Sequence, residues 1–401
     1  MTYHRFPFSR RQVLRGLLAT GAFGATSQFW VGCSPSPDST AETGTEDTTA
    51  SPSAAAAALT MGFIYVGPKD DYGWNQAHAE GAAGVAKVPG VKVVEEASVP
   101  ETTAVAETMR GMIVQDGATV LFPTSFGYFD PYILELAKEF PEVQFFHCGT
   151  LYEEGKHPAN VGSYFGFIDQ AYYIAGIIAA HTSKTGKLGF VMAKPIPRIV
   201  RTLNSWMLGA KSVNPDATTQ LIITGAWTDP VKEAEAVNSM VDQSVDVVTC
   251  NVDNAKVVME TAEKRGIFCS GNGVDQSAVA PKGYLTGAEW DWTGVYSSYA
   301  SLIQGGKTLM NGGIPHTYLG GLKDNFVKLS PYGAAVSDAA KQDAETAKAG
   351  LLDGSLVVYK GEIKDNAGNV VIAAGTEYKP GDPELEKMDW LVEGVLGQIT
   401  S

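Results

Sequence analysis

The chain contains few cysteines, and their arrangement excludes the structures that cysteine usually supports. Four occur in 401 residues, without a Cys-x-x-Cys pair or a Cys/His cluster at the spacing of a zinc site. Cys33 lies near the start of the chain, whereas Cys148, Cys250 and Cys269 lie at the ends of segments that read as buried strands. Buried cysteine commonly behaves as a small hydrophobic residue. We therefore expect neither a metal site nor a disulfide framework.

Basic residues are also scarce. The chain has 30 lysines and arginines against 44 aspartates and glutamates, for a formal net charge of -14. Several of the basic residues lie within the first 15 positions, so the rest of the chain is more acidic still. Binding to nucleic-acid phosphates requires a basic face. We therefore expect no nucleic-acid partner and interpret the acidity as a solubilising surface charge.

The sequence lacks the common signatures of catalysis and of cofactor binding. It has no Gly-x-Ser-x-Gly motif, no Gly-x-Gly-x-x-Gly after the first predicted strand, and no complete Gly-x-x-x-x-Gly-Lys-Ser/Thr phosphate loop. The six histidines are scattered and form no metal-like doublet. His78 falls on a predicted helix, where we expect it at the surface. We therefore expect no cofactor and no enzymatic activity.

Residues 1–33 have the pattern of an export signal. Arg10 and Arg11 precede a mostly apolar run, 16–31, which is too short and too rich in small residues for a secure membrane span. This arrangement resembles a twin-arginine signal, an address for export. A small residue before Cys33 resembles a bacterial lipobox, although Trp30 stands where leucine is usual, and predicts lipidation of Cys33. Plain secretory cleavage, with Cys33 in the discarded leader, is the alternative.

Residues 34–57 consist almost entirely of Ser, Pro, Thr, Ala, Glu, Asp and Gly. Such a composition cannot bury enough apolar area to offset the entropy of the chain. We predict a disordered linker, which would let a tethered body reach both solute and a membrane partner. A spacer without a special role is compatible with the same residues.

From residue 58 onward, short apolar runs alternate with longer amphipathic stretches. The apolar runs are typical of parallel strands that are covered on both faces. We predict strands at 60–66, 91–97, 119–122, 143–147, 161–165, 187–192, 220–224, 245–250, 266–269 and 283–287. We predict helices at 75–87, 102–115, 130–139, 170–182, 198–213, 230–243 and 254–264. The alternation predicts an α/β fold of open parallel sheets. The length of the chain predicts two lobes, because a single hydrophobic core stops growing near roughly 250 to 300 residues.

Open parallel sheets bind ligands outside the carboxyl ends of their strands. The segments directly after strands are therefore the candidate site: 67–75, 123–130, 225–230, 251–254, 271–277 and 288–292. They are rich in aromatic residues, namely Trp74, Phe126, Tyr128, Trp227, Trp290 and Trp292. Indole faces suit a flat aromatic ligand, because offset stacking adds about 0.5–1.5 kcal/mol per pair beyond the buried area. The alternative is that each tryptophan closes the end of a core.

Polar side chains accompany these aromatic residues: Asn75, Thr124, Ser125, Asp229, Asn251, Asp253 and Asp275. A few placed donors and acceptors in an apolar pocket fix the orientation of a ligand. We favour Asp275 as the ligand acceptor, because a carboxylate accepts two hydrogen bonds from ring N–H groups or ribose hydroxyls. Capping of the following turn is the alternative for Asp275. It is the stronger interpretation for Asp229, which Pro230 follows.

A series of motifs runs along the body in unbroken order. They are Gly62-Phe63-Ile64-Tyr65-Val66-Gly67-Pro68, Gly73-Trp74-Asn75, Thr124-Ser125-Phe126-Gly127-Tyr128, Pro195-Ile196-Pro197, Leu208-Gly209-Ala210, Val213-Asn214-Pro215, Trp227 with Asp229-Pro230, and Gly320-Gly321-Leu322-Lys323-Asp324. Together they resemble the basic membrane protein (BMP) family of substrate-binding proteins, which includes the PnrA-like purine nucleoside receptors. The resemblance extends from about Leu59 to the C-terminus.

The resemblance implies a type I periplasmic-binding-protein fold, in which two doubly wound parallel-sheet lobes are joined by a three-segment hinge. The first lobe would comprise 58–165 plus 290–320, and the second 166–289 plus 321–401. It also implies that Trp74 stacks on a base, with Asn75 beside it, and that Trp227 covers the opposite face. Asp275 would hold ribose hydroxyls.

Two positions depart from the family pattern. A ligand-contacting aspartate after the third strand is replaced by Thr124 or Ser125, and a lysine near the final crossover is replaced by Trp290. We therefore predict a purine-like ligand and leave the choice between nucleobase and nucleoside open. The predicted ligand-binding residues are Trp74, Asn75, Thr124, Ser125, Phe126, Trp227, Asp253, Asp275 and Trp290.

The resemblance further implies an exported solute-binding component of an ABC importer. Its partners would be the permease and ATPase subunits, and a lipid anchor would hold it at the outer face of the membrane. A receptor that senses a ligand without transport is one alternative. An exported, cofactor-dependent enzyme is the other, because twin-arginine leaders often serve such proteins.

Overall fold

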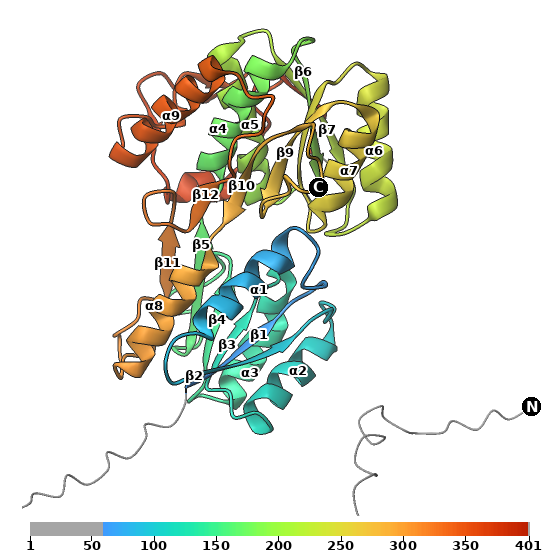
Figure 1. The fold of residues 1–401 in the computed structure, drawn as a ribbon. Coiled ribbons are helices and arrows are strands. Elements are labelled where there is room, and N and C mark those ends of the chain that lie inside the picture. The colour runs from blue at the N-terminus through green and yellow to red at the C-terminus, as the bar shows by residue number, and fades with distance from the viewer. Residues whose placement is uncertain (1–58, 400–401) are drawn as a thin grey trace, which may run out of the picture. The chain divides into compact units, whose positions relative to one another are not determined.

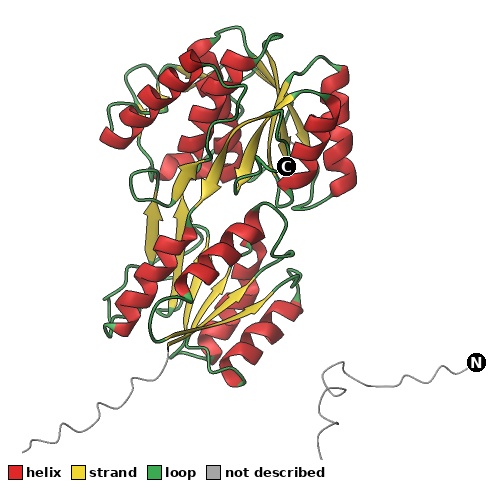
Figure 2. Cartoon of the chain, viewed as in Figure 1, coloured by secondary structure: helices red, strands yellow, loops and turns green. Residues whose placement is uncertain are grey.

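The computed structural model describes residues 59–399, which belong to one compact unit, Ala56–Ser401. The predicted signal with Cys33 (1–33) and the predicted linker (34–57) lie outside the described residues. Figure 1 traces the chain, and Figure 2 distinguishes its helices from its strands. The described residues form two large, mainly parallel sheets, each with helices on both faces.

The first sheet is built mainly from the N-terminal part of the described chain. Its strands are β1 (Leu59–Ile64), β2 (Val91–Glu96), β3 (Val120–Pro123), β4 (Gln144–Cys148), β5 (Val161–Gly166) and β11 (Thr317–Gly320). They are parallel, in the order β11-β5-β4-β3-β1-β2. The helices α1 (Trp74–Val85) and α8 (Trp292–Gln304) cover one face, and α2 (Thr103–Val114) and α3 (Leu134–Glu139) cover the other. The short turns η1 (Phe126–Tyr128) and η2 (Phe129–Ile133) precede α3.

The central strand β1 is mostly apolar and wholly buried because both faces of the sheet are covered there, whereas β2 at the edge carries Lys92, Glu95 and Glu96. Successive side chains of a strand point to opposite faces. In β1, Phe63 packs in the core that contains α1 and α8, whereas Ile64 packs in the core that contains α2 and α3. Both side chains are fully buried. A strand in this position therefore favours apolar residues on both of its faces, and five of the six residues of β1 are apolar or glycine.

The second sheet follows in the chain and has the same plan. Its strands are β6 (Lys187–Met192), β7 (Thr218–Ile223), β8 (Val247–Asn251), β9 (Phe268–Gly273), β10 (Tyr284–Trp290), β12 (Val327–Leu329) and β17 (Val395–Leu396). Their order is β12-β10-β9-β8-β6-β7-β17, and β12 alone runs antiparallel among these strands. The helices α4 (Asp169–Thr182) and α5 (Pro197–Val213) cover one face, with α9 (Asp338–Asp353) packed against α4, and α6 (Pro230–Asp242) and α7 (Ala255–Arg265) cover the other.

The described chain passes between the two sheets after β5, after β10 and after β11. This arrangement confirms the predicted fold class, two doubly wound parallel-sheet lobes joined by three segments. Each predicted strand corresponds to one of the strands β1 to β10, with ends shifted by a few residues. The helix predicted at 130–139 begins instead as η2 and becomes α-helical at Leu134. The predicted lobe boundaries stay a prediction.

Short elements follow α9 near the C-terminal end of the described chain. They are β13 (Tyr359–Lys360) paired with β16 (Glu377–Tyr378), β14 (Ile363–Lys364) paired with β15 (Val370–Ile372), and the turn η3 (Pro383–Lys387). The turn η3 packs against α5, and β17 then joins the sheet beside β7. None of these elements was predicted, because runs of two or three residues give no measurable periodicity.

The prediction that His78 lies at the surface is wrong. Its imidazole is fully buried, with Nδ1 2.5 Å from the hydroxyl of Tyr296 and its ring stacked on Trp292 at 5.0 Å between centroids. Burial lowers the pKa of His78 well below the ordinary value, so the ring is neutral. The face of α1 that carries His78 packs against α8, a helix that periodicity did not reveal.

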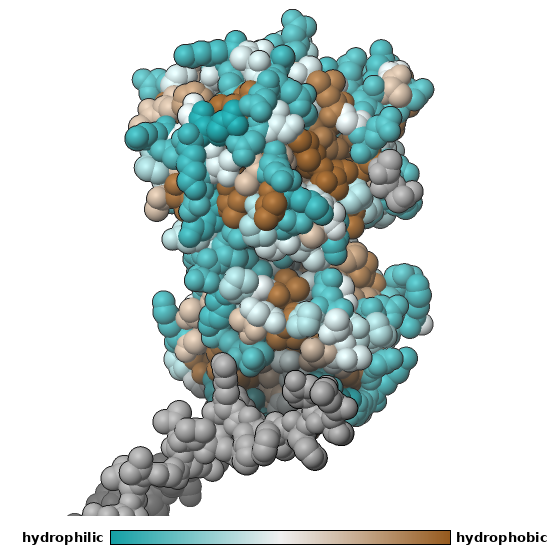
Figure 3. Space-filling view, turned by 90° about the vertical axis from the view of Figure 1, so that its right-hand side faces the viewer, coloured by the Kyte–Doolittle hydropathy of each residue, from teal (hydrophilic) through white to brown (hydrophobic). Residues whose placement is uncertain are grey.

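On the face in Figure 3, hydrophilic residues cover most of the described surface, and hydrophobic residues gather in patches. The larger patch lies on the lobe of the second sheet. None of the helices among residues 59–399 is both long enough and apolar enough to cross a membrane.

The close packing of α4 against α5 depends on glycine. A Cβ added at Gly209 would overlap the carbonyl oxygen of Tyr173, and one added at Gly176 would overlap that of Trp206.

We expect Gly209→Ala to destabilise the protein by about 1–3 kcal/mol, the usual cost of overpacking. Gly111→Ala in α2 is the matched control: a Cβ there meets nothing within 4 Å, and the change should stabilise by roughly 0.5–1 kcal/mol. Urea unfolding measures both, and a neutral Gly209→Ala would contradict the packing argument.

Candidate functional site

A cavity lies where the carboxyl ends of strands from both sheets meet. Its volume is about 700 Å³, counting space that is open to solvent. The part of the chain up to β5 contributes Trp74, Ser125, Phe126 and Phe165 to the lining. The part from β6 to β10 contributes Arg198, Trp227, Asn251, Asp253, Asn272 and Trp290.

The topology of the sheets explains this position. In each sheet the first strand in sequence, β1 or β6, lies between the second and the third, so the order of the strands reverses there. A crevice forms at the carboxyl ends of the strands at such a reversal. Residues that follow β1 and β3 line the cavity, and so do residues that follow β6 and β8.

The first wall of the cavity is aromatic. Trp74, at the start of α1, makes an edge contact with Trp290 at 5.7 Å between ring centroids. Trp290 stacks on Trp292 at 4.9 Å and meets Phe165 edge-on at 5.2 Å. Trp74 is half-buried, whereas Trp290 and Trp292 are buried. The indole of Trp74 therefore packs against neighbouring aromatic rings and also lines the cavity.

Hydrogen bonds to the carboxylate of Asp71 fix the start of α1. This buried carboxylate accepts from the backbone N–H groups of Gly73 (2.9 Å), Asn75 (3.0 Å) and Gln76 (2.9 Å). It also accepts from the side-chain amide of Asn75 at 2.7 Å. These bonds satisfy N–H groups that a helix end leaves unpaired, and they hold Trp74 at the cavity.

Trp227 comes from the loop after β7 and lines the same cavity from the second lobe. The ammonium group of Lys194 lies 4.4 Å from the centroid of its ring and 3.8 Å from a carboxylate oxygen of Glu101. Trp74 and Trp227 therefore line one cavity from different lobes, which is the arrangement that a sandwiched ring requires. That they hold a ligand between them stays a prediction.

Asp253 carries the cavity's most distinctive polar group. Its carboxylate lines the cavity and makes no hydrogen bond with any side chain or backbone group among residues 59–399. Burial raises its pKa well above the ordinary value, and the negative charges of Asp71, Glu101 and Glu233 add to that effect, while Lys194 opposes it. A buried carboxyl group without a partner gains strongly from a ligand that supplies one.

Two of the predicted residues support the site without lining the cavity. Asn75 is buried and accepts a hydrogen bond from Gly67 N–H at 3.1 Å. Thr124 is fully buried and donates to the carbonyl of Ile64 at 2.9 Å. Ser125 does line the cavity, and its hydroxyl donates to Glu101 at 2.5 Å.

Asp275 is not brought into the cavity. Its side chain is exposed, and its carboxylate accepts from Ser277 N–H at 2.8 Å. This is the capping role that we weighed as the alternative. Asp229 likewise caps α6, accepting from Lys232 N–H at 3.1 Å. Sequence position alone did not separate a carboxylate that caps its own loop from one that lines the cavity.

Arg198 was missed. It is the second residue of α5 and lines the cavity. The segment after β6, 193–198, follows a strand like those that we considered, so the rule on carboxyl ends would have found it. Within residues 59–399, no group of three or more His, Cys, Asp or Glu side chains has the arrangement of a metal site.

Comparison with known proteins shows similarity to substrate-binding proteins of ABC transporters. A family model described as "ABC transporter substrate-binding protein PnrA-like" matches residues 58–377. A purine-binding protein of Brucella abortus (strain 2308) is 34% identical over 339 residues, which is 84% of this chain and 93% of that protein. A putative ABC transporter glucose-binding protein of Haloferax volcanii is 28% identical over 345 residues, 86% of this chain and 82% of that protein.

Solved structures show the same fold. An ABC transporter solute-binding protein from Conexibacter woesei DSM 14684 superimposes with a TM-score of 0.61 at 24% identity, covering 75% of this chain and 98% of that one. At this identity the likeness concerns the fold alone.

We expect Asp253→Asn to stabilise the protein without ligand by about 0.5–2 kcal/mol, the usual gain from one stabilising substitution. Because the folded pKa is raised above the unfolded value, the wild-type carboxyl group costs stability that grows as the pH rises between the two values. The gain should therefore be larger near about pH 8 than near about pH 4. Denaturant unfolding at both pH values measures it.

Asp275→Asn is the control, because an exposed carboxylate that caps a turn can be replaced by an amide oxygen. Its stability should change little at either pH. A destabilised Asp253→Asn at the higher pH would contradict the description of Asp253 as unpaired.

Proposed function

Because the chain belongs to the PnrA-like family of ABC transporter substrate-binding proteins, we propose that it binds a purine, as free nucleobase or nucleoside, in the cavity between the two lobes. The family is one of solute-binding proteins and not of enzymes. One observation carries the proposal: aromatic rings from both lobes and the unpaired carboxyl group of Asp253 line a single cavity. Flat heterocycles have two faces for rings and an edge for hydrogen bonds.

The similarity to a purine-binding protein supports this ligand class. The glucose-binding relative supplies the competing one, since sugars also bind to aromatic surfaces. Asp275, which the family resemblance assigns to ribose, lies outside the cavity lining. We therefore propose Trp74, Trp227, Trp290, Phe126, Ser125 and Asp253 as ligand contacts, and leave out Asn75, Thr124 and Asp275.

Import is the proposed purpose of binding. The ligand-bound form would dock on a permease whose ATPase supplies the energy, and a lipid on Cys33 would keep the protein at the outer face of the membrane. Ligand would shift an equilibrium between lobe arrangements by binding one of them better. Genes for a permease and an ATPase next to this one would support import over sensing without transport.

Isothermal titration tests the ligand class directly. We expect heat from at least one of guanine, hypoxanthine, adenine or their nucleosides, and none from glucose under the same conditions. Absence of binding to all purines, with binding to glucose, would replace the proposed ligand class with a sugar.

A colourless purified protein excludes a flavin and other coloured cofactors, which addresses the alternative of a cofactor-dependent enzyme.

Trp74→Ala should weaken purine binding by roughly 1–3 kcal/mol, the scale of one base–aromatic stack. Trp74→Phe is the matched control, because it keeps a ring at the same place and should retain most of the affinity. Both are measured by titration on protein whose unfolding transition has been checked. Equal affinity of wild type and Trp74→Ala would mean that the indole only closes the end of a core.

Asp253→Asn should weaken purine binding by about 1–3 kcal/mol, the cost of leaving a buried donor of the ligand without its partner. Asp275→Asn should leave the affinity unchanged, because that carboxylate lies outside the cavity. The reverse result would restore the role that the family resemblance assigns to Asp275. The same titrations measure both variants.

A further inference from the structure

Arg198 lines the cavity and is held rigidly. Its side chain is only 11% exposed, and its guanidinium lies 3.9 Å from the ring centroid of Phe165, which also lines the cavity. Stacking of this kind fixes the plane of a guanidinium group. The direction of any remaining N–H group is therefore set before a ligand arrives.

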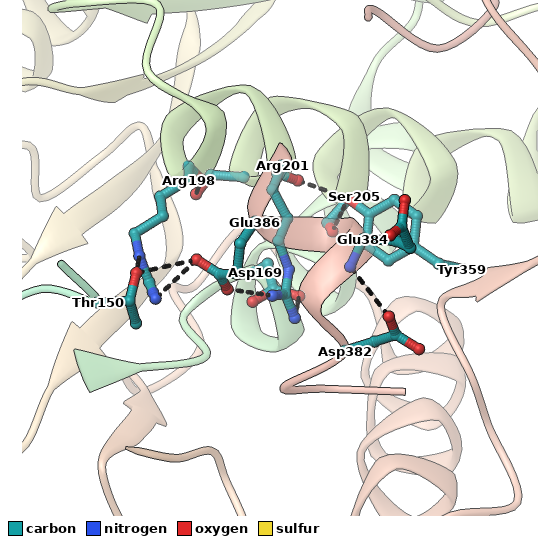
Figure 4. Close-up of polar contacts among 10 residues, drawn as sticks. Thr150, Asp169, Arg198, Arg201, Ser205, Tyr359, Asp382, Glu384 and Glu386 are labelled. Carbon is teal, nitrogen blue, oxygen red and sulfur yellow. Dashed lines mark hydrogen bonds and ion pairs between the residues drawn. The ribbon is translucent and has the colours of Figure 1, made fainter. Parts of the chain in front are cut away.

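Three polar contacts close a ring around this guanidinium (Figure 4). Arg198 Nε donates to the hydroxyl of Thr150 at 3.0 Å, and Nη2 lies 2.8 Å from Glu386 Oε2. The hydroxyl of Thr150 in turn donates to the same oxygen of Glu386 at 3.1 Å. Thr150 follows β4 in the first sheet, whereas Arg198 and Glu386 lie on α5 and η3 of the second lobe. Glu386 lies beyond residue 377, where the match to the family model ends.

The surrounding charges balance. Glu386 also pairs with Arg201 at 3.4 Å, and Arg201 pairs with Asp169 at 3.0 Å. Two arginines thus face two carboxylates, with no positive charge left over. Burial lowers the pKa of Arg198 to about 10, so the side chain stays protonated at neutral pH. With the carboxyl group of Asp253 in the same cavity, this balance disfavours an anionic ligand such as a nucleotide and favours an uncharged one.

One nitrogen of Arg198 remains for a ligand. Nη2 is fully buried beside Glu386, where it forms an ion pair without hydrogen-bond geometry, so it is closed to a ligand. Nη1 makes no hydrogen bond with any residue among 59–399 either, but it is not among the fully buried atoms that lack a partner. It therefore keeps accessible surface in a side chain that lines the cavity. The cavity then offers fixed donors at Arg198 and an acceptor at Asp253.

Purines differ in how they match such a pair. Guanine carries the acceptors O6 and N7 on one edge, and arginine is the usual partner of that edge. Its N1–H and amino groups are donors that suit a carboxylate. Adenine carries an amino group where guanine has O6. An arginine N–H facing that amino group would leave two donors opposed.

We propose that Arg198 donates a hydrogen bond from Nη1 to the ring carbonyl of the ligand, and that the site consequently prefers oxopurines such as guanine and hypoxanthine over adenine. Glu386 acts as the positioning residue that holds Arg198 in place. This inference rests on the proposed function, because it names the class of purine that the same cavity takes.

The test compares affinities for hypoxanthine, guanine and adenine, measured by titration on wild type and on Arg198→Met. Wild type should bind the oxopurines about 10-fold or more tightly than adenine, the scale of a hydrogen bond that is left unpaired in the wrong ligand. Arg198→Met should lower oxopurine affinity by about 10- to 100-fold and adenine affinity by less than about 3-fold. The ratio of two affinities measured on one preparation does not depend on the folded fraction, so partial misfolding cannot imitate this result.

Glu386→Gln tests the positioning role. It keeps the side-chain shape but removes the charge that orients Arg198, so the preference for oxopurines should fall by about 3- to 10-fold. Glu384→Gln is the control on the same turn, because Glu384 pairs only with the exposed Lys387 at 2.6 Å among the described residues. That variant should keep the wild-type ratio.

The outcomes separate the inference from the function on which it rests. Wild type that binds no purine overturns the proposed function and this inference with it. Purine binding with no preference for oxopurines, or an Arg198→Met variant that lowers all affinities by the same factor, overturns this inference alone. Glu386→Gln with an unchanged ratio overturns the positioning role of Glu386.

Discussion

Parallel strands of a doubly wound sheet end together, and the arrangement of the cavity follows from that constraint. The chain leaves the carboxyl ends of β1 and β3 in one lobe and of β6 and β8 in the other, where the strand order reverses. Trp74, Ser125, Arg198 and Asp253 are far apart in sequence, yet each follows one of these strands. The geometry of the backbone therefore gathers the site, and the individual side chains only give it chemical character.

The polar groups of the cavity fall into two kinds. Arg198 is anchored on Thr150 and Glu386 and stacked on Phe165, whereas the carboxyl group of Asp253 has no partner among the described residues. An anchored donor is pre-organised, since little freedom is lost when a ligand accepts from it. An unpaired carboxyl group costs stability in the empty protein and makes binding more favourable. The two kinds together are expected of a binding site rather than of a structural core.

Contacts between the lobes surround the cavity. Trp74 N–H donates to the carbonyl of Asp253 at 3.4 Å, and the side-chain amide of Gln276 donates to the carbonyl of Tyr72 at 2.6 Å. Glu101 of the first lobe joins them through its ion pair with Lys194. The same segments that line the cavity thus also link the lobes. Any separation of the lobes would have to break these bonds.

The sequence by itself determined the alternation of strands and helices, the two parallel sheets and the edge at which a ligand would bind. Short, mostly apolar runs are typical of strands that are covered on both faces, and that pattern is local enough to read directly. It also predicted that Trp74, Trp227 and Asp253 lie at this edge, because each belongs to a segment that connects a strand to the next helix, and all three line the cavity. Only the tertiary structure decided that Asp275 caps its own turn while Asp253 faces the cavity, and that Glu386 orients Arg198. These outcomes depend on contacts between residues that are distant in the chain, and no local pattern specifies which of two carboxylates finds a partner.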